Sequence, residues 1–447
     1  MKRLFGTDGI RAVAGTPPLD PRTVRKFGLA LADVLHQGLG RAPRVVCGRD
    51  TRESGPWLRD AVADGLAARG GTMIDAGVIT TPGLAYATHN TGFDAGVMIS
   101  ASHNPFEDNG LKVFSSDGVK LEDAVESRVE SIILDAATPT PPEGAGKAVP
   151  DDSLLSGYVK VLETAVPGGR FAGLRLLLDC ANGSASAIAP TVFSDLGAEV
   201  ETIGNRPDGK NINLGCGSLY VESLASRVQE GRFDMGLAFD GDADRCLAVD
   251  RRGRVVDGDH ILFLCARRMK RRSALPGNSI VATIMSNFWL EKRLADEGIV
   301  LHRAPVGDKY VLERMIAEDS ALGGEQSGHV IFRSVGTTGD GILTGLLLVD
   351  AVLDDAVPLE ATLDGIVPFP QMLINVRVSE KPDLRAHPEI GPVVAEAERA
   401  LSGRGRVVLR YSGTESLARV MVEADDDTLV KSTAERVATI IREHLGT

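Results

Sequence analysis

Short apolar runs alternate along the first third of the chain with segments whose apolar residues recur every three or four positions. Asp20 and Pro21 suit the start of a helix, because aspartate caps free N–H groups and proline fits the first turn. The helical spacing that follows ends at Gly38, and Ser54 is expected to cap a second helix. Strands are predicted at 44–47, 73–75 and 95–99. Strands that alternate with helices are typical of parallel βα units.

The alternation continues through two further blocks, and a Pro/Gly-rich stretch at 138–144 marks the approach to the first boundary. The last block has a different order, with strands at 372–378, 407–409 and 418–423 and helices at 393–401 and 429–445. We therefore predict an α/β chain of three similar α/β domains and a smaller α+β domain. The predicted domains are 1–150, 151–254, 255–368 and 369–447.

The net charge of the chain limits the classes of partner that it can bind. A formal net charge of −12 at pH 7 argues against a nucleic-acid partner, whose binding face would be basic. Polar residues interrupt the N-terminal segment too early for a signal peptide, and the most apolar later run, 342–349, is too short to span a bilayer. We therefore expect a cytoplasmic protein without a membrane partner.

The cysteine pattern points to the same compartment. Five cysteines are widely scattered and form no CxxC pair, which argues against a disulfide framework or a structural zinc site. Reduced thiols in the core are expected instead. The five are Cys47, Cys180, Cys216, Cys246 and Cys265.

The first candidate chemistry lies in residues 98–112 (MISASHNPFEDNGLK). An apolar strand ends abruptly there, so Ser102 and His103 are expected on a loop at the carboxyl end of a strand, where open α/β sheets place their chemistry. Asn104 and Pro105 favour an extended turn that constrains this loop. Taken alone, the segment is equally typical of an ordinary Ser/Asn/Pro loop, and the other motifs decide between the two interpretations.

Three carboxylates form the second candidate, because Asp240, Asp242 and Asp244 alternate with small residues. Carboxylates this close repel one another unless a hard divalent cation holds them together. An EF-hand loop opens with the same spacing, but it would need glycine and glutamate where this chain has Arg245 and Arg251. The pattern therefore predicts Mg²⁺ rather than Ca²⁺, and its alternative is a solvated acidic turn.

Two later segments have the composition of ligand-binding loops. Residues 410–414 (RYSGT) combine a guanidinium, hydroxyl groups and a glycine that lets backbone N–H groups approach a phosphate monoester. The phosphate ligands expected there are Arg410, Ser412, Gly413 and Thr414, and the alternative is a polar hairpin turn. Glu325 and Ser327 are two positions apart, so on an extended chain they point the same way and can bind adjacent sugar hydroxyls.

Five motifs occur in a fixed order along essentially the whole chain: FGTDGIR at 5–11, the serine loop, DGDADR at 240–245, GEQSGH at 324–329 and RYSGTE at 410–415. As a set they closely resemble the signature of the α-D-phosphohexomutase superfamily, which interconverts sugar 1- and 6-phosphates. Within it, the opening motif, Cys246 and Gln326 are most similar to the bacterial phosphoglucosamine mutases. The resemblance implies mixed sheets and domains arranged around a central cleft.

The resemblance also implies the roles of individual residues. Ser102 would carry a phosphoryl group, one oxygen of which completes a single Mg²⁺ site with the three aspartates. Arg11 and Arg245 would stabilise phosphoryl charge, and Lys309 would lie near the substrate. The candidates for the base that accepts the sugar's proton are His103, Lys112 and His329. The resemblance places the last two close to the reacting oxygens and does not choose between them.

The sequence thus predicts reversible conversion of glucosamine 6-phosphate to glucosamine 1-phosphate through glucosamine 1,6-bisphosphate, supplying UDP-N-acetylglucosamine for cell-wall precursors. No GxxxxGK[ST] loop is present, so ATP is not expected as the donor and the phosphoryl group comes from Ser102. The alternatives are a phosphomannomutase or phosphoglucomutase of the same superfamily, a metal-dependent sugar-phosphate phosphatase and a non-catalytic sensor. Ser416 stands where the family commonly has proline. The sequence leaves the oligomeric state open, with a homodimer as one alternative.

Overall fold

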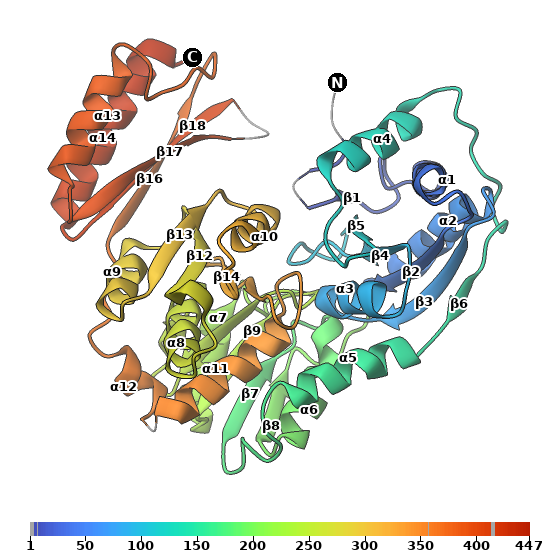
Figure 1. The fold of residues 1–447 in the computed structure, drawn as a ribbon, viewed down its shortest axis with the longest axis horizontal. Helices are drawn as coiled ribbons and strands as arrows, with labels where there is room; N and C mark the ends of the chain where they lie inside the picture. The colour runs from blue at the N-terminus through green and yellow to red at the C-terminus, as the bar shows by residue number, and fades with distance from the viewer. Residues whose placement is uncertain (1–3, 7, 356, 413–415) are drawn as a thin grey trace. The chain divides into compact units, whose positions relative to one another are not determined.

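The structure is a computed structural model that describes residues 4–6, 8–355, 357–412 and 416–447. Its elements fall into two compact units (Figure 1). The larger comprises residues 1–283 and 304–362, and the smaller comprises residues 284–303 and 363–447. Each unit buries apolar clusters of its own.

The larger unit begins with a six-stranded sheet. Its strands are β1 (Ile10–Val13), β2 (Arg44–Arg49), β3 (Thr72–Val78), β4 (Ala95–Ile99), β5 (Asp108–Ser115) and β6 (Ala148–Pro150). They lie in the order β1-β5-β4-β2-β3-β6. The sheet is mixed, because β4, β2, β3 and β6 run parallel whereas β5 is antiparallel to both of its neighbours.

Helices cover both faces of this sheet. They are α1 (Pro21–Leu39), α2 (Gly55–Ala67), α3 (Thr81–Asn90), α4 (Asp123–Leu134) and α5 (Ser153–Thr164). Successive side chains of β2 point to opposite faces. Val45 and Cys47 therefore pack with α1, α2 and α4, whereas Val46 packs with α3 and α5. Figure 1 shows α1 and α2 together on one side of the strands.

The second sheet has five strands in the order β11-β10-β9-β7-β8. They are β7 (Arg175–Asp179), β8 (Glu199–Ile203), β9 (Met235–Phe239), β10 (Cys246–Asp250) and β11 (Val255–Val256), and the helices between them are α6 (Ala189–Asp195) and α7 (Val221–Gly231). β7, β8 and β9 are parallel, and β10 returns antiparallel to β9. The loop between β9 and β10 carries the DGDADR motif.

The remainder of the larger unit is built on β12 (Ser279–Thr283), β14 (Leu322–Gly324) and β15 (Val330–Phe332). β12 and β14 are parallel, and β15 pairs antiparallel with β14. The accompanying helices are α8 (Gly258–Arg271), α10 (Asp308–Ala317) and α11 (Gly341–Asp355). The apolar run at 342–349 lies in α11, so it forms a buried helix as predicted.

The smaller unit contains a three-stranded antiparallel sheet, β16-β18-β17. Its strands are β16 (Gln371–Arg377), β17 (Gly405–Tyr411) and β18 (Leu417–Ala424), and α13 (Ile390–Ala400) and α14 (Asp427–Leu445) pack against it. The unit also includes α9 (Phe288–Asp296) and nearly all of β13 (Val300–Ala304), while α12 (Leu359–Leu363) lies where the chain leaves the larger unit. The α/β prediction, with mixed sheets and a smaller α+β part, is confirmed. The boundaries near residues 150, 254 and 368 stay a prediction.

Of the two side-chain helix caps expected from the sequence, the structure contains the one at Asp20 but not the one at Ser54. The Asp20 carboxylate accepts hydrogen bonds from the N–H groups of Arg22 and Thr23, which confirms its capping role. Ser54 precedes α2, but its side chain does not cap the helix. Its Oγ instead accepts a hydrogen bond from Asn109 Nδ2 at 2.8 Å. The expected cap is therefore wrong at Ser54, because a tertiary partner occupies the hydroxyl.

Candidate active site

The serine loop begins where β4 ends at Ile99, as the sequence predicts. Ser102 is 1% exposed and has a φ of 50°, in the left-handed region that non-glycine residues rarely adopt. Its Oγ donates a hydrogen bond to Asp240 Oδ2 at 2.5 Å and lies 3.3 Å from His103 Nδ1. The structure therefore brings the serine to the carboxylate triad.

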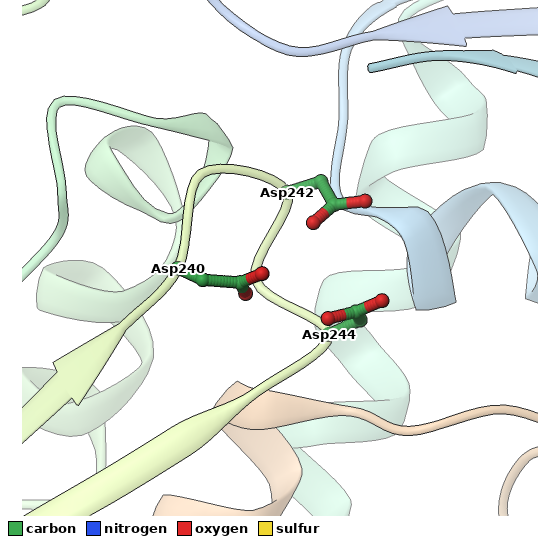
Figure 2. Close-up of side chains that lie close together, drawn as sticks. All are labelled: Asp240, Asp242 and Asp244. Atoms are coloured by element: carbon green, nitrogen blue, oxygen red, sulfur yellow. The ribbon is translucent and has the colours of Figure 1, made fainter. Parts of the chain in front are cut away.

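The triad occupies the loop between β9 and β10 (Figure 2). Each of Asp240, Asp242 and Asp244 offers one carboxylate oxygen, and these atoms lie within 4.8 Å of one another. All three residues are buried. Gly241 is required in this loop, because a Cβ there would lie 2.5 Å from the Ser102 carbonyl oxygen.

The pKa values of Asp240 and Asp242 are shifted in opposite directions. Burial and the neighbouring carboxylates of Asp244 and Asp242 raise the pKa of Asp240 well above its usual value. Burial also acts to raise the pKa of Asp242, but the ammonium of Lys112 outweighs it and the pKa is lowered. The three carboxylates therefore repel one another, and the triad itself contains no positive charge that offsets this repulsion. This is expected for carboxylates that share a cation site.

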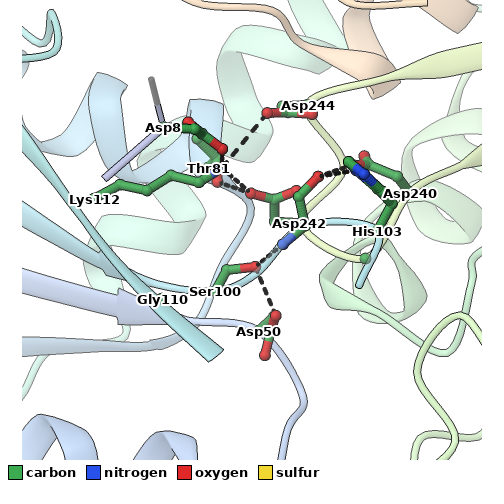
Figure 3. Close-up of polar contacts among 12 residues, drawn as sticks. Asp8, Asp50, Thr81, Ser100, His103, Gly110, Lys112, Asp240, Asp242 and Asp244 are labelled. Carbon is green, nitrogen blue, oxygen red and sulfur yellow. Dashed lines mark hydrogen bonds and ion pairs between the residues drawn. The ribbon is translucent and has the colours of Figure 1, made fainter. Parts of the chain in front are cut away.

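Lys112 is the main counter-charge on the protein side (Figure 3). Its Nζ lies 2.8 Å from Asp242 Oδ2, 3.1 Å from Asp8 Oδ2 and 3.7 Å from Asp244 Oδ2. Burial lowers the pKa of Lys112, but these carboxylates more than offset burial, so its pKa is raised. These carboxylates therefore favour the charged form of Lys112. Thr81 Oγ1 also donates to Asp242 Oδ2, at 2.6 Å.

His103 and the arginines complete the surroundings of the serine. Burial, together with the positive charges of Arg245 and Arg11, lowers the pKa of His103 to about 4. Its imidazole is therefore neutral near pH 7. Arg11 lies in β1 and pairs with Asp8, and Arg245 Nε lies 3.8 Å from Asp244 Oδ1.

The GEQSGH segment is a turn between β14 and β15, so the expectation of an extended chain there is wrong. The N–H of Gly328 bonds to the carbonyl oxygen of Glu325 at 3.0 Å, which reverses the chain. Glu325 and Ser327 still meet, because Ser327 Oγ donates to Glu325 Oε2 at 3.3 Å. Glu325 Oε1 in turn accepts the N–H of Gly307 at 3.0 Å. This bond joins the motif to Gly307, which precedes helix α10 and therefore Lys309.

His329 lies at the end of the same turn and is buried. Its Nε2 accepts a hydrogen bond from the Gly339 N–H at 3.1 Å and lies 3.8 Å from Asp308 Oδ2. Nδ1 is buried without a hydrogen-bond partner among the described residues. Lys309 Nζ pairs with Asp123 at 2.7 Å.

The predicted phosphate loop belongs to the smaller unit and is described only in part. Arg410 is the last residue but one of β17, where it stands directly opposite Arg419 in β18. Burial and the charge of Arg419 lower the pKa of Arg410. Ser412 is buried, and its N–H bonds to Leu417. Gly413 and Thr414 lie outside the described residues.

Several residues of this environment were not anticipated from the sequence. Asp8 lies within the FGTDGIR motif, so the motif itself was the available signal. Thr81, Lys120 and Asp308 belong to the same polar network, and no spacing rule singles them out. Arg419 is brought opposite Arg410 by the register of β17 and β18, which the sequence alone does not give.

The donor set suits a hard divalent cation. One oxygen each of Asp242 and Asp244 is buried without a hydrogen-bond partner among the described residues, next to the Ser102 hydroxyl and Asp240. Buried carboxylate oxygens normally have a partner, and all-oxygen donor sets are those preferred by Mg²⁺. The residues present therefore fit a magnesium ion.

Comparison with known proteins agrees with this geometry. Residues 2–139, 156–253, 257–369 and 373–440 match the phosphoglucomutase/phosphomannomutase alpha/beta/alpha domains I, II and III and the C-terminal domain, respectively. The phosphoglucosamine mutase of Solibacter usitatus is 47% identical, with 100% of this chain and 99% of the relative covered. That of Deinococcus radiodurans is 46% identical, with 99% and 98% covered.

Solved structures show the same fold. A phosphoglucomutase/phosphomannomutase family protein from Burkholderia thailandensis has a TM-score of 0.79 at 24% identity, with 99% of each chain covered. The N-acetylphosphoglucosamine mutase of Aspergillus fumigatus, in complex with GlcNAc-6P and magnesium, has a TM-score of 0.63 at 20% identity, with 100% of this chain and 96% of that chain covered.

Fold and site together define an isomerase of the phosphohexomutase class, an intramolecular phosphotransferase. Within that class, the chain belongs to the phosphoglucosamine mutase family. Among the described residues, no helix combines the length and apolar character needed to cross a bilayer.

Proposed function

We propose that this chain converts glucosamine 6-phosphate to glucosamine 1-phosphate and back, with Ser102 as the carrier of the phosphoryl group. The observation that supports this most directly is the 2.5 Å hydrogen bond from Ser102 Oγ to Asp240. It places a buried nucleophile beside carboxylates that fit a magnesium ion. The names of the relatives support the choice of sugar.

The proposed cycle begins with phosphorylated Ser102. The free sugar hydroxyl attacks the phosphorus, the bond to Ser102 Oγ breaks, and the hydroxyl proton passes to a base. The product is glucosamine 1,6-bisphosphate. After the sugar turns around, Ser102 Oγ attacks the phosphorus of its other phosphate, and the bond from that phosphorus to the sugar oxygen breaks. The sugar oxygen takes the proton back from the base, which restores the phosphoserine and releases the isomerised monophosphate.

The chain's own residues would divide this work. Lys112 lies among carboxylates as a fixed cation, so we assign it to stabilising charge on the transferring group rather than to proton abstraction. His103 and His329 remain the candidates for the base. Arg11 and Arg245 would orient the phosphoryl group. Bound at Asp240, Asp242, Asp244 and a phosphoserine oxygen, Mg²⁺ would supply Lewis-acid stabilisation of phosphoryl charge.

The remaining predicted residues would bind the substrate. Glu325 and Ser327 would contact sugar hydroxyls, and Lys309 would lie near the substrate. The phosphate that does not react would be held by Arg410, Ser412, Gly413 and Thr414. We add Arg419, because it stands directly opposite Arg410 on the sheet and the two positive charges together would attract a phosphate.

The test measures initial rates with the 6-phosphates of glucosamine, glucose and mannose, each with Mg²⁺ and a catalytic amount of the matching 1,6-bisphosphate. We expect the highest kcat/KM for glucosamine 6-phosphate, with the 1-phosphate as product. A preference for glucose or mannose would reject the choice of sugar. Release of inorganic phosphate without any 1-phosphate would reject the mutase reaction in favour of a phosphatase.

Ser102→Ala should reduce turnover by at least about 10⁴-fold, because the covalent route is lost, while thermal unfolding stays close to wild type. Ser226→Ala, which removes a hydroxyl bonded only within helix α7, is the matched control and should keep full activity. Substantial activity in the Ser102 variant would contradict the assignment of the phosphoryl carrier.

A further inference from the structure

The backbone of the serine loop is gathered mainly around the buried side chain of Arg52. Asn213 Nδ2 also donates to the carbonyl groups of Ser102 and Asn104, at 2.9 and 3.0 Å. The same two carbonyl groups accept hydrogen bonds from Arg52 Nη2 at 3.0 and 2.8 Å. Those of Pro105 and Asp108 accept hydrogen bonds from Nη1, the latter at 2.9 Å. A guanidinium has five N–H donors, and these four contacts account for both terminal nitrogens.

The fifth donor binds a carboxylate that reaches the serine from the other side. Nε of Arg52 donates to Asp50 Oδ2 at 2.9 Å, and both side chains are completely buried. Asp50 Oδ2 also accepts the hydroxyl of Ser100 at 2.6 Å. Ser100 Oγ in turn accepts the N–H of Ser102 at 2.9 Å, and Figure 3 shows the link between Asp50 and Ser100. The N–H and the carbonyl group of Ser102 are therefore both tied to this ion pair.

This arrangement has a physical reason in the conformation of the serine. Ser102 has a φ of 50°, a conformation that costs a non-glycine residue roughly 1–2 kcal/mol and persists only where the surroundings impose it. Four carbonyl dipoles that converge on one point also repel one another. The guanidinium offsets both costs, because it offers charge and directed donors to the loop at the same time.

We propose that Arg52 is a positioning residue of phosphoryl transfer, which holds Ser102 in its strained conformation through the loop carbonyl groups. This inference rests on the proposed function. Arg52 touches neither the Ser102 hydroxyl nor the aspartate triad, so its effect is on the position of Oγ and not on substrate binding. Displacing a reacting group by about 1 Å costs on the order of 100-fold in rate.

The test is Arg52→Lys, which keeps the charge but has three donors on a single nitrogen and cannot span four carbonyl groups. We expect kcat to fall at least about 100-fold while KM for glucosamine 6-phosphate stays within about threefold. Amide hydrogen exchange should accelerate in residues 100–110 and remain unchanged in the strands of the second sheet. Arg59→Lys is the matched control, because Arg59 pairs with Asp60 and Asp75 instead of with the loop. It should keep the wild-type kcat.

Either a kcat within threefold of wild type or exchange that accelerates throughout the molecule would overturn the proposal. Ser100→Ala serves as a second, milder variant if the lysine variant does not fold. It deletes the acceptor of the Ser102 N–H and the donor to Asp50 while leaving Arg52 in place. It should lower kcat about tenfold at constant KM; an unchanged kcat would overturn the proposal. If wild type itself lacks mutase activity, the proposed function fails. Exchange in residues 100–110 then still decides whether Arg52 holds the loop.

Discussion

At the scale of single residues, Asp340 is a buried carboxylate with a titration that can be measured. Its Oδ2 accepts the hydroxyl of Tyr158 at 2.8 Å, and its Oδ1 accepts the Leu343 N–H at 3.0 Å. Burial raises its pKa to about 6 despite these bonds. The groups that face it, Tyr158 and Cys246, have pKa values raised by burial, so both stay neutral below pH 7.

The raised pKa predicts how stability depends on pH. The folded state holds the Asp340 proton more tightly than the unfolded state, so this contribution to stability is complete at low pH and disappears as pH rises through about 6. From pH 5 to pH 7 the wild type should lose about 1 kcal/mol more than Asp340→Asn. Thermal unfolding of both proteins at the two pH values measures this. Parallel pH profiles would show that Asp340 titrates normally.

Individual site residues could be predicted where a motif fixed their chemistry. Ser102 and the three aspartates were identified from the sequence, and the structure places them together. Arg52 could not be identified, because its role depends on four carbonyl groups of a loop about 50 positions away, which no local spacing reveals. The base could not be assigned either, since the charge of Lys112 depends on three carboxylates from two distant segments.

At the scale of elements, the packing of α1 against α2 depends on glycine. A Cβ on Gly28 would lie 2.3 Å from the Val62 carbonyl oxygen, and a Cβ on Gly65 would lie 2.2 Å from that of Arg25. The two helices therefore approach to backbone contact. Gly38, near the end of α1, has nothing within 4 Å of its Cβ position.

Two alanine substitutions in α1 should therefore have opposite effects. Gly28→Ala should destabilise the protein by about 1–3 kcal/mol or more, because the added methyl group overpacks the helix contact. Gly38→Ala should stabilise it by about 0.5–1 kcal/mol, because alanine loses less backbone entropy in a helix. Calorimetric unfolding of both variants measures the contrast. A Gly28 variant as stable as wild type would show that the helices can move apart without cost.

The elements that the sequence predicted are those with clear periodicity, such as α1, α13 and α14. Helix α3 was not predicted, since most of its residues are buried and its sequence, TPGLAYATHN, shows no apolar stripe. The GEQSGH segment was expected to be extended. Its turn is set by Gly328, which has a φ of 90°, a conformation that propensity alone does not reveal.

At the scale of the molecule, ion pairs join segments that lie far apart along the chain. Lys120 Nζ lies 2.5 Å from Asp8 Oδ1 and 2.7 Å from Asp308 Oδ2, within the larger unit, and its side chain is 15% exposed. Asp8 also pairs with Lys112, and Asp308 approaches His329. The ammonium of Lys120 thus connects three segments near the candidate site: its own and those that carry Asp8 and Asp308. The sequence predicted the motifs but not this connection, because long-range pairing depends on the completed fold.

Replacing Lys120 with methionine tests this connection. The variant keeps most of the side chain's volume but leaves two partly buried carboxylates without their shared cation. Breaking a fully buried pair costs about 3–5 kcal/mol, and the loss here should be smaller because Asp8 keeps Lys112 and Arg11 as partners. The unfolding temperature should therefore fall, and the double variant with Asp308→Asn should recover part of the loss because one of the two charges is gone. Lys210→Met removes an exposed ion pair with Glu53 and should change little. If the Lys120 variant melts like the Lys210 control, the three segments are held together by packing rather than by charge.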